Sequence, residues 1–545
     1  MARVVSPSLK ASTAGGAPAP RIAGLIVVAL VGAWFLLFGV AWAVSDPVPA
    51  GPDEAMHMIH ALAVGQGQIT GQPGPSPNRP IGLGDTIRFW DQTTRYFSVN
   101  ARRAPDSVYS CVARTLDQPA TCTDGAKCQR YAPLSPRPCS DPAGSAPGNR
   151  VLGTYTGTYE PTLYLLPGLV ARLATNDVGA MRLARLGAVM LGTASVMGAA
   201  ALLWDRRARG LSLLGLVVAI TPMVLYMNGV LNPNGGEMVL TACFFAAVLR
   251  VLRGNTRASR WTWTALGVSG GLLAVSRPLT WLWIAVAIAI ALALGARRAL
   301  EVLRRSGPRA WVAMAAVVIG LAADQIWWRW IVLTPKSPAT FSTYLANIGG
   351  AVAALPGWFH EEIGLLGWVE LPVPLAVAAT WWCIIAGLVI TALVVGTGRQ
   401  RVVLALAIAG DLVVTVLLGA VLQAQAGLPM QARYLLPFNI IVVMLAGEIV
   451  LQARHRQHWW VTSAVVVTAL AAVLCDGASW WANSQRFAVG IHGPLYFPAL
   501  PLWSPPLGWA TWVAAMAIGS LALVSAAVVA ELPSRLGRSN HRVLH

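Results

Sequence analysis

The sequence predicts an all-α integral membrane protein with about 12 transmembrane helices. Hydrophobic residues make up 56% of its 545 residues, and charged residues only 11%. Several apolar stretches exceed the roughly 18 residues that indicate a transmembrane helix. The net charge of +18 comes mainly from arginines in the short gaps between these stretches. Because cytoplasmic loops of membrane proteins are enriched in Lys and Arg, this charge indicates topology and not a nucleic-acid partner.

The apolar stretches give the expected elements in order. Residues 1–21, rich in Ala, Pro, Ser and Gly, predict a disordered cytoplasmic tail. The stretch 22–44 is too long for the core of a signal peptide and is expected to be the first span of a membrane domain covering 22–531. Residues 532–545 are expected to be a second cytoplasmic tail. After a long polar segment, the further spans are expected at 181–203, 211–230, 236–253, 261–276, 279–296, 310–332, 374–396, 402–422, 434–452, 459–475 and 508–530.

Successive spans cross the membrane in opposite directions, and with about 12 of them both termini and the arginine clusters are expected on the cytoplasmic side. The extracytoplasmic side then receives three loops, at 45–180, 333–373 and 476–507. These loops contain most of the polar residues that could do chemistry. We therefore expect a multi-pass protein whose active face is extracytoplasmic. The Arg- and Ala-rich, Lys-poor composition suggests a bacterium, and hence its plasma membrane.

Four cysteines lie in the first outer loop, at Cys111, Cys122, Cys128 and Cys139. Their spacing contains no CxxC pair, so it is not typical of a zinc site. Two disulfides in an oxidising compartment fit this loop better, although the sequence does not fix their pairing.

The stretch "GPDEAMHMIHALAVGQG" follows the first span and contains Asp53, Glu54, His57 and His60. It predicts a helix with Asp53 as its N-cap, lying along the outer membrane surface on an apolar stripe. On such a helix Asp53, His57 and His60 share one face. They form either a solvated polar face or an acid/base or metal site. An unsatisfied carboxylate beside the bilayer is costly in free energy, which favours the acid/base or metal site.

Two arginines on the outer side, Arg277 in "SRPLTW" and Arg433 in "QARYLLP", are not explained by the positive-inside rule. A guanidinium group offers a planar fork that suits phosphate, whereas snorkelling towards lipid headgroups is the alternative. No phosphate-binding loop and no GxSxG motif is present, so ATP-driven transport and serine hydrolysis gain no support.

Aromatic and amide side chains accompany these arginines. Tyr434 follows Arg433, and Tyr159 and Glu160 lie just before the second span. Asn232 begins an Asn-Pro-Asn turn, where it caps a helix or contacts a substrate. Tyrosines at this level are either interface anchors or contacts to a carbohydrate or isoprenoid.

The order of these motifs resembles a bacterial family of polytopic membrane proteins. "PDE" follows the first span, "YEPTLYLLP" precedes the second, "TP" and "NPN" follow the third, and "GLLGW" and "QARYLLP" precede later spans. This order resembles the family called domain of unknown function 2142, and it is similar to the GT-C glycosyltransferases, over roughly residues 22–450. The resemblance implies use of a lipid-phosphate-linked sugar. It also implies an acidic catalytic base, or in some branches a metal ligand, where Asp53 and Glu54 stand.

A membrane glycosyltransferase is therefore the expected function. It would move a sugar from a polyprenyl-phosphate donor to a cell-envelope glycan or lipid acceptor. Asp53 or Glu54 would act as general base, and Arg433 with Arg277 would hold the departing phosphate. Glu160, Tyr159, Tyr434 and Asn232 are expected to contact substrate.

Two points stay open at this stage. A divalent metal, Mg²⁺ or Mn²⁺, would find candidate ligands in His57, His60 and Asp53. The alternative functions are a transporter or flippase for lipid-linked saccharides, or a non-catalytic subunit for envelope assembly. Transport would place ionisable groups near the middle of the spans, where Asp324 and Asp411 are the main ones.

Overall fold

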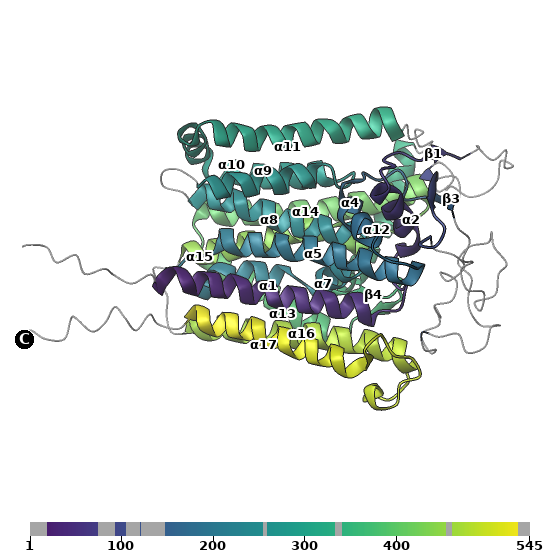
Figure 1. The fold of residues 1–545 in the computed structure, drawn as a ribbon. Coiled ribbons are helices and arrows are strands. Elements are labelled where there is room, and N and C mark those ends of the chain that lie inside the picture. Colours follow the sequence, from purple (N-terminus) through teal and green to yellow (C-terminus); the bar gives the residue numbers. More distant parts are fainter. Residues whose placement is uncertain are drawn as a thin grey trace, which may run out of the picture.

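The computed structural model describes residues 19–74, 93–104, 120, 148–253, 259–332, 340–453 and 460–531. These residues form a bundle of long helices with a layer of short helices and strands at one end (Figure 1). Within the described residues, nine helices are long and apolar enough to cross a membrane, or ten if one bent pair counts as a span. The predicted all-α, multi-pass membrane architecture is confirmed, but the count of 12 is not reached.

The long helices follow most of the predicted spans. They are α1 (Ala19–Ser45), α5 (Asp177–Leu203), α8 (Pro233–Arg253), α10 (Thr280–Ser306), α11 (Pro308–Ile326), α13 (Leu375–Val395), α14 (Gly398–Ala426), α16 (Trp460–Val489) and α17 (Gly508–Glu531). Two predicted spans form shorter helices, α9 (Arg260–Ala274) and α15 (Leu436–Gln452). At 15 and 17 residues, they fall short of the roughly 20 residues that a straight crossing needs.

The predicted span 211–230 is broken in the structure. The 3-10 helix η2 (Arg209–Leu213) and α6 (Leu214–Ala219) are followed by α7 (Pro222–Gly229) at a bend of 67°. Proline lacks an N–H and disfavours helical geometry in the residue before it, so the first helix ends there. The side chain of Thr221 then caps α7 by accepting a hydrogen bond from Val224 N. The Thr-Pro dipeptide thus fixes the break.

Helix α16 continues to Val489, well beyond the expected end at residue 475. The sequence turns polar after Cys475, but the side chains of Asp476, Ser479, Asn483 and Arg486 are all buried. They face the protein interior and not an aqueous loop, which is why composition misplaced the helix end. The third outer loop therefore covers only residues 490–507 and contains the 3-10 helix η6 (Phe497–Ala499).

The arginines predicted to be cytoplasmic gather at one end of the bundle. Arg209 Nη1 donates to Glu531 O at 3.0 Å, and Arg253 Nη1 donates to Leu203 O at 2.6 Å. Helix α1 begins and α17 ends at this same end (Figure 1). This arrangement agrees with the predicted even number of crossings.

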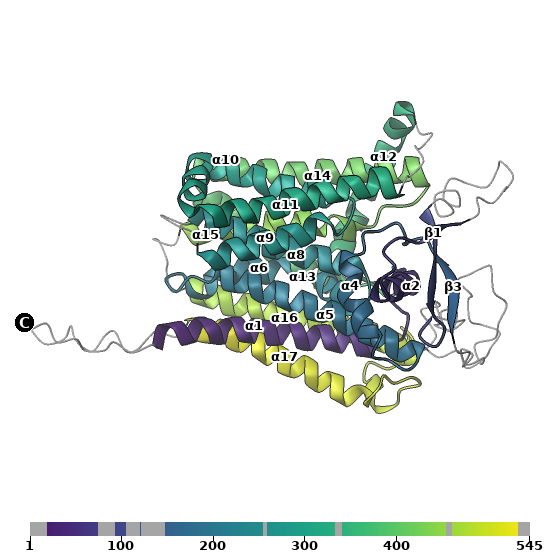
Figure 2. The same ribbon diagram turned by 45° about the horizontal axis from the view of Figure 1, so that its top comes forward.

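The opposite end contains the first two outer loops. It also contains a three-stranded antiparallel sheet, in the order β1 (Gln72–Pro73), β2 (Arg95–Asn100) and β3 (Asn149–Thr154). The sheet packs on helix α2 (Glu54–Gly65), and α2 also packs on helix α4 (Thr162–Ala171) (Figure 2). The π-helical turn η3 (Trp327–Val332) ends the predicted span 310–332. The predicted second outer loop, 333–373, contains helix α12 (Phe341–Ile363) and the hairpin of β4 (Leu365–Leu366) and β5 (Leu371–Pro372). The 3-10 helix η4 (Ala432–Tyr434) precedes α15.

Helix α12 runs along α14, and the Tyr344 hydroxyl near its start accepts a hydrogen bond from Gln425 Nε2 at 3.1 Å. The predicted disulfide cysteines Cys111, Cys122, Cys128 and Cys139 lie outside the described residues, as do residues 1–18 and 532–545 of the two predicted tails.

Candidate functional site

Helix α2 is buried and does not lie on the membrane surface as predicted. Eleven of its 12 residues are buried between α4, the sheet and the bundle. Asp53 stands at the predicted N-cap position, but its backbone is left-handed with φ at 56°, and its side chain caps no backbone N–H. This conformation leaves the Asp53 carboxylate free to point away from its own helix.

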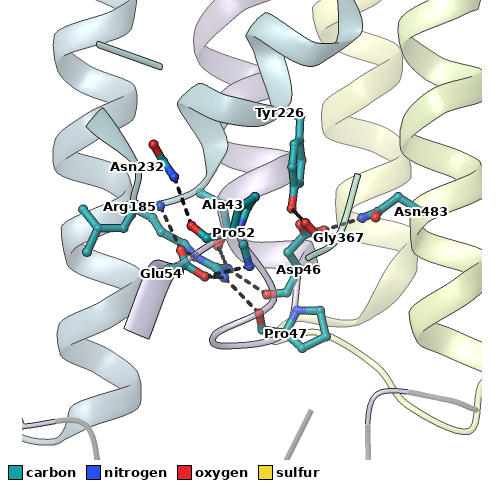
Figure 3. A network of polar contacts seen from close by, with 12 residues as sticks. Ala43, Asp46, Pro47, Pro52, Glu54, Arg185, Tyr226, Asn232, Gly367 and Asn483 are labelled. Carbon is teal, nitrogen blue, oxygen red and sulfur yellow. Dashed lines mark hydrogen bonds and ion pairs between the residues drawn. The ribbon is translucent and has the colours of Figure 1, made fainter. Parts of the chain in front are cut away.

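The neighbouring carboxylate, Glu54, lies in a buried ion pair with Arg185 of α5 (Figure 3). Both side chains are fully buried, and two nitrogens of Arg185 donate to the two oxygens of Glu54 at 2.6 Å each. The backbone N–H groups of Gly51 and Leu231 donate to Glu54 at 3.0 and 2.8 Å. Four donors therefore occupy Glu54, which leaves it little capacity to act on a substrate.

The rest of the Arg185 guanidinium binds backbone carbonyls at the end of α1. Nη1 donates to Ala43 O and Asp46 O, and Nη2 donates to Pro47 O, at 2.8–2.9 Å (Figure 3). All five N–H groups of Arg185 thus have acceptors, as a buried guanidinium requires. This network holds the segment between α1 and α2 in place.

The network extends to α16, and a further hydrogen bond lies beside it. Asp46 accepts a hydrogen bond from Asn483 Nδ2 of α16 at 2.6 Å, and Tyr226 of α7 donates to Gly367 O at 2.8 Å (Figure 3). Burial raises the pKa of Asp46 to about 7, although the positive charge of Arg185 opposes this. The segment that carries Asp53 is therefore fixed to α5, to α16 and to the chain at Leu231.

Asp53 meets two residues from distant parts of the sequence. The Tyr155 hydroxyl donates to Asp53 Oδ1 at 2.6 Å, and Arg433 Nη2 lies 3.4 Å from Asp53 Oδ2. The side chain of Asp53 is 29% exposed, whereas that of Arg433 is only 2% exposed. The carboxylate is therefore oriented by two donors and stays accessible.

The guanidinium group of Arg433 has unused hydrogen-bond donors. Its Nε and Nη1 atoms are buried and have no hydrogen-bond partner in the described part of the chain. Its position is set by η4, where Ala432 N donates to the Glu361 carboxylate of α12 at 3.2 Å. Because a buried guanidinium with unpaired N–H groups is costly, this geometry is typical of a receptor for an anion.

Arg277 lies beside Arg433, with one aromatic ring between them. The guanidinium carbon of Arg277 is 5.5 Å from the ring centroid of Tyr434, and that of Arg433 is 5.4 Å from it. A second ring, Tyr159, lies 5.4 Å from Arg277. Arg277 also pairs with Glu237 of α8 at 3.3 Å. The structure thus brings together Asp53, Arg277, Arg433, Tyr159 and Tyr434, all predicted from sequence.

Asn232 supports this cluster and does not face it directly. Its Oδ1 accepts from the backbone and side chain of Asn234 at 3.0 and 2.7 Å, and its Nδ2 donates to Pro52 O at 3.0 Å. Asn234 in turn accepts a hydrogen bond from Arg277. The Asn-Pro-Asn turn therefore joins Arg277 to the residue just before Asp53.

His57 and His60 are buried among aromatic rings. His57 Nδ1 lies 2.7 Å from the Tyr164 hydroxyl, and the His60 ring packs on Phe97 and Tyr164 at 5.3 and 4.3 Å. Burial, with the positive charges of Arg277 and Arg433, lowers the pKa of His57 well below its ordinary value. Burial lowers the pKa of His60 to about 3. Both rings are therefore neutral at pH 7.

A metal does not fit this arrangement well. Across the described residues, no group of three or more His, Cys, Asp or Glu side chains is placed to hold a metal ion. His57 already pairs with a hydroxyl, and His60 is stacked between rings. The reaction proposed below therefore uses protein side chains and no metal ion.

Glu160 points away from the arginines. It accepts a hydrogen bond from Trp328 Nε1 in η3, and the Asp324 carboxyl of α11 lies beside it. Glu160 is only 2% exposed. Burial raises its pKa to about 8, and the neighbouring Asp324 adds to this effect. Glu160 thus docks the outer loop onto α11, while the adjacent Tyr159 faces the site.

This raised pKa predicts a pH-dependent stability. A carboxyl group whose folded pKa exceeds its unfolded value stabilises the fold at low pH and loses that contribution as the pH rises through the folded pKa. We expect the thermal midpoint to fall between about pH 5 and about pH 9, and Glu160→Gln to flatten this slope. Differential scanning calorimetry of both proteins in the same detergent checks this. An unchanged slope in the variant would contradict it.

Sequence reasoning missed two residues of this region. Arg185 lies within a predicted span, and Tyr155 lies five residues before Glu160. Arg185 had a usable signal, because it lies near the outer end of its span, where the positive-inside rule predicts no arginine. The partner of Tyr155 lies 102 residues away, and no local pattern marks that contact.

Comparisons with known proteins place the chain in a family. No curated protein matched the sequence. Among solved structures, it is similar to the crystal structure of ArnT from Cupriavidus metallidurans bound to undecaprenyl phosphate, at 13% identity and a TM-score of 0.39, over 94% of this chain and 77% of that chain. The family model described as "Predicted membrane protein (DUF2142)" matches residues 36–444, about three quarters of the chain. The chain therefore belongs to the DUF2142 family of predicted membrane proteins.

Proposed function

We propose that this protein transfers a sugar from a polyprenyl-phosphate donor to a cell-envelope glycan or lipid acceptor. One observation carries the proposal. A buried arginine, Arg433, has two unpartnered donor nitrogens and lies 3.4 Å from the accessible carboxylate of Asp53. An anion receptor beside a carboxylate is the arrangement that displacement of a phosphate by a hydroxyl group requires.

Four residues of the chain have separate roles in the proposed reaction. Asp53 takes the proton from the acceptor hydroxyl as its oxygen bonds to the anomeric carbon of the donor. The bond from that carbon to the phosphate oxygen breaks, and negative charge collects on the departing polyprenyl phosphate. The free N–H groups of Arg433 stabilise this charge, and Arg277 adds a second positive charge nearby. Tyr155 holds the carboxylate in position.

Glu54 has a structural role in this proposal, although the sequence made it an equal candidate for the base. Its oxygens already accept four hydrogen bonds, two of them from a fully buried arginine. Tyr159 and Tyr434 form the aromatic walls of the site, and Asn232 positions it. Glu160 supports the loop behind Tyr159.

The location follows from topology. The site lies at the end of the bundle opposite the clustered arginines, which the positive-inside rule assigns to the cytoplasm. The site therefore faces the extracytoplasmic side of a bacterial plasma membrane. A lipid-linked donor can reach it with its chain in the bilayer and its head at the outer face. The motif resemblance to GT-C glycosyltransferases points to the same donor class.

Reconstitution in proteoliposomes tests the proposal. Purified protein is supplied with radiolabelled polyprenyl-phosphate hexoses and pentoses together with extracted envelope glycans and lipids, and label in the acceptor is measured. Transfer with at least one donor is expected. A complete lack of transfer in folded protein, together with no binding of polyprenyl phosphate, would refute the proposal.

Replacing Arg433 tests the phosphate receptor separately. A hydrogen bond to a charged group contributes about 1.5–3 kcal/mol, so Arg433→Gln is expected to weaken polyprenyl-phosphate binding by roughly tenfold to a hundredfold. Arg433→Lys keeps the charge but loses the planar fork, and should recover only part of the affinity. Arg103→Gln, on the same end of the molecule but outside the site, is the matched control. Equal affinity of Arg433→Gln and the control would show that phosphate binds elsewhere.

A further inference from the structure

A cavity lies inside the helical bundle, apart from the Asp53 and Arg433 site. Its volume is about 280 Å³, and helices α6, α12, α13, α14 and α15 surround it. Most of its wall is aliphatic, formed by residues such as Ile385, Val389, Ile408, Ile440 and Val443. A cavity of this lining suits a hydrocarbon chain.

Two carboxyl groups interrupt the apolar wall. Glu362, near the end of α12, and Asp411, in the middle of α14, both line the cavity, and Asp411 is close enough to raise the pKa of Glu362. Glu362 is only 3% exposed, and the buried Oδ1 of Asp411 has no hydrogen-bond partner among the described residues. The Asn439 amide and the Thr221 hydroxyl are further polar groups of the lining next to Glu362.

No positively charged side chain of the described residues forms an ion pair with either carboxyl. None of the ion pairs in the described part of the chain includes Glu362 or Asp411. Three other buried carboxylates, Glu54, Glu237 and Glu448, each face an arginine. Of the described residues, the other buried carboxyls without an arginine, Glu160, Asp324 and Asp476, do not line this cavity. Ionising both groups in a low-dielectric wall is costly without a cation. Burial, with the nearby Asp411, accordingly raises the pKa of Glu362 to about 8, and a cation between the two groups would offset this cost.

Aromatic rings complete the cavity. Phe359 and Trp382 both line it, with their centroids 5.4 Å apart in an edge-to-face pair. Trp382 Nε1 donates to Phe359 O at 2.7 Å, which fixes the indole ring in place. Aromatic faces beside carboxylates are the combination that binds an organic ammonium group, through cation–π attraction and ion pairing.

We propose that this cavity binds an amphiphilic ammonium compound. The ammonium head lies between Glu362 and Asp411, and the hydrocarbon tail lies along the aliphatic residues of α13, α14 and α15. Leu412 lines the cavity and is also exposed on the outside of the bundle, and we expect the ligand to enter beside it from the surrounding lipid. This cavity is proposed to bind a cation, whereas Arg433 is proposed to bind an anion. The cavity is independent of the proposed sugar transfer.

Three probes with the same chain and different heads test this inference: octylammonium, octanol and octanoate. Their binding to wild-type protein in lipid nanodiscs is measured by equilibrium dialysis at neutral pH, with empty nanodiscs subtracted. An ion pair supported by hydrogen bonds should favour octylammonium over octanol by about tenfold or more. Octanoate should bind most weakly. Equal binding of octylammonium and octanol, or a preference for octanoate, would overturn the proposal without any variant.

Variants locate the site. Glu362→Gln combined with Asp411→Asn should reduce octylammonium affinity to that of octanol. Asp476→Asn removes another buried carboxyl, in α16, that does not line the cavity, and should leave the preference intact. Retention of the preference in the double variant would place the ammonium elsewhere and refute the assignment. If the double variant does not fold, Asp411→Asn alone is expected to lower the preference severalfold.

Discussion

Replacing Asp53 by asparagine is expected to lower the rate of sugar transfer by roughly 100- to 10,000-fold, the range that a positioned general base contributes. The amide keeps the shape of the carboxylate and still accepts a hydrogen bond from Tyr155, which lies 2.6 Å from Oδ1. It cannot accept the proton of the acceptor hydroxyl. Initial rates in proteoliposomes measure the effect, and the affinity for polyprenyl phosphate should change far less.

Two further variants make this prediction specific. Asp53→Glu keeps a carboxylate and should recover part of the lost rate. Asp177→Asn removes another carboxylate, at the start of α5 on the same end of the bundle, and should leave the rate unchanged. If Asp53→Asn transferred sugar as fast as Asp177→Asn, Asp53 would not be the base.

The choice between Asp53 and Glu54 shows where sequence reasoning ends. Both are acidic, adjacent and just outside the first span, so composition and topology treat them alike. Successive residues of a helix point about 100° apart, so neighbours meet different surroundings. Glu54 turns towards Arg185 and the backbone of Leu231, whereas Asp53, left-handed at the helix start, turns towards Arg433. Only the partners from distant segments separate their roles.

The two arginines could be predicted because they break a rule. Arg277 and Arg433 lie on the side that the sequence predicts to be extracytoplasmic, where the positive-inside rule does not predict positive charge. The sequence did not predict that both guanidinium groups approach the ring of Tyr434. The two arginines are 156 residues apart, and no periodic pattern encodes such a contact. Helix α2 was misplaced for a related reason. Its polar side chains resemble a solvated face, but His57 and His60 pack on aromatic rings of α4 and the sheet.

Breaking the buried pair of Glu54 and Arg185 is expected to cost about 3–5 kcal/mol of folding free energy. Both side chains are fully buried, so Glu54→Gln leaves the Arg185 charge without its partner in a low-dielectric interior. The glutamine also presents an N–H group where Glu54 accepted hydrogen bonds from Gly51 or Leu231. Denaturant unfolding in bicelles, followed by circular dichroism, measures the loss.

The matched control is the exposed pair of Glu301 and Arg305 on α10. Its side chains are 56% and 52% exposed, and Glu301→Gln should change stability by no more than about 0.5 kcal/mol. A double replacement, Glu54→Leu with Arg185→Met, removes both charges together and should recover part of the loss, because no unpaired charge remains. A cost for Glu54→Gln no larger than that for Glu301→Gln would show that the buried pair does not hold this segment. Asp53 would then owe its position to Tyr155 and Arg433 alone.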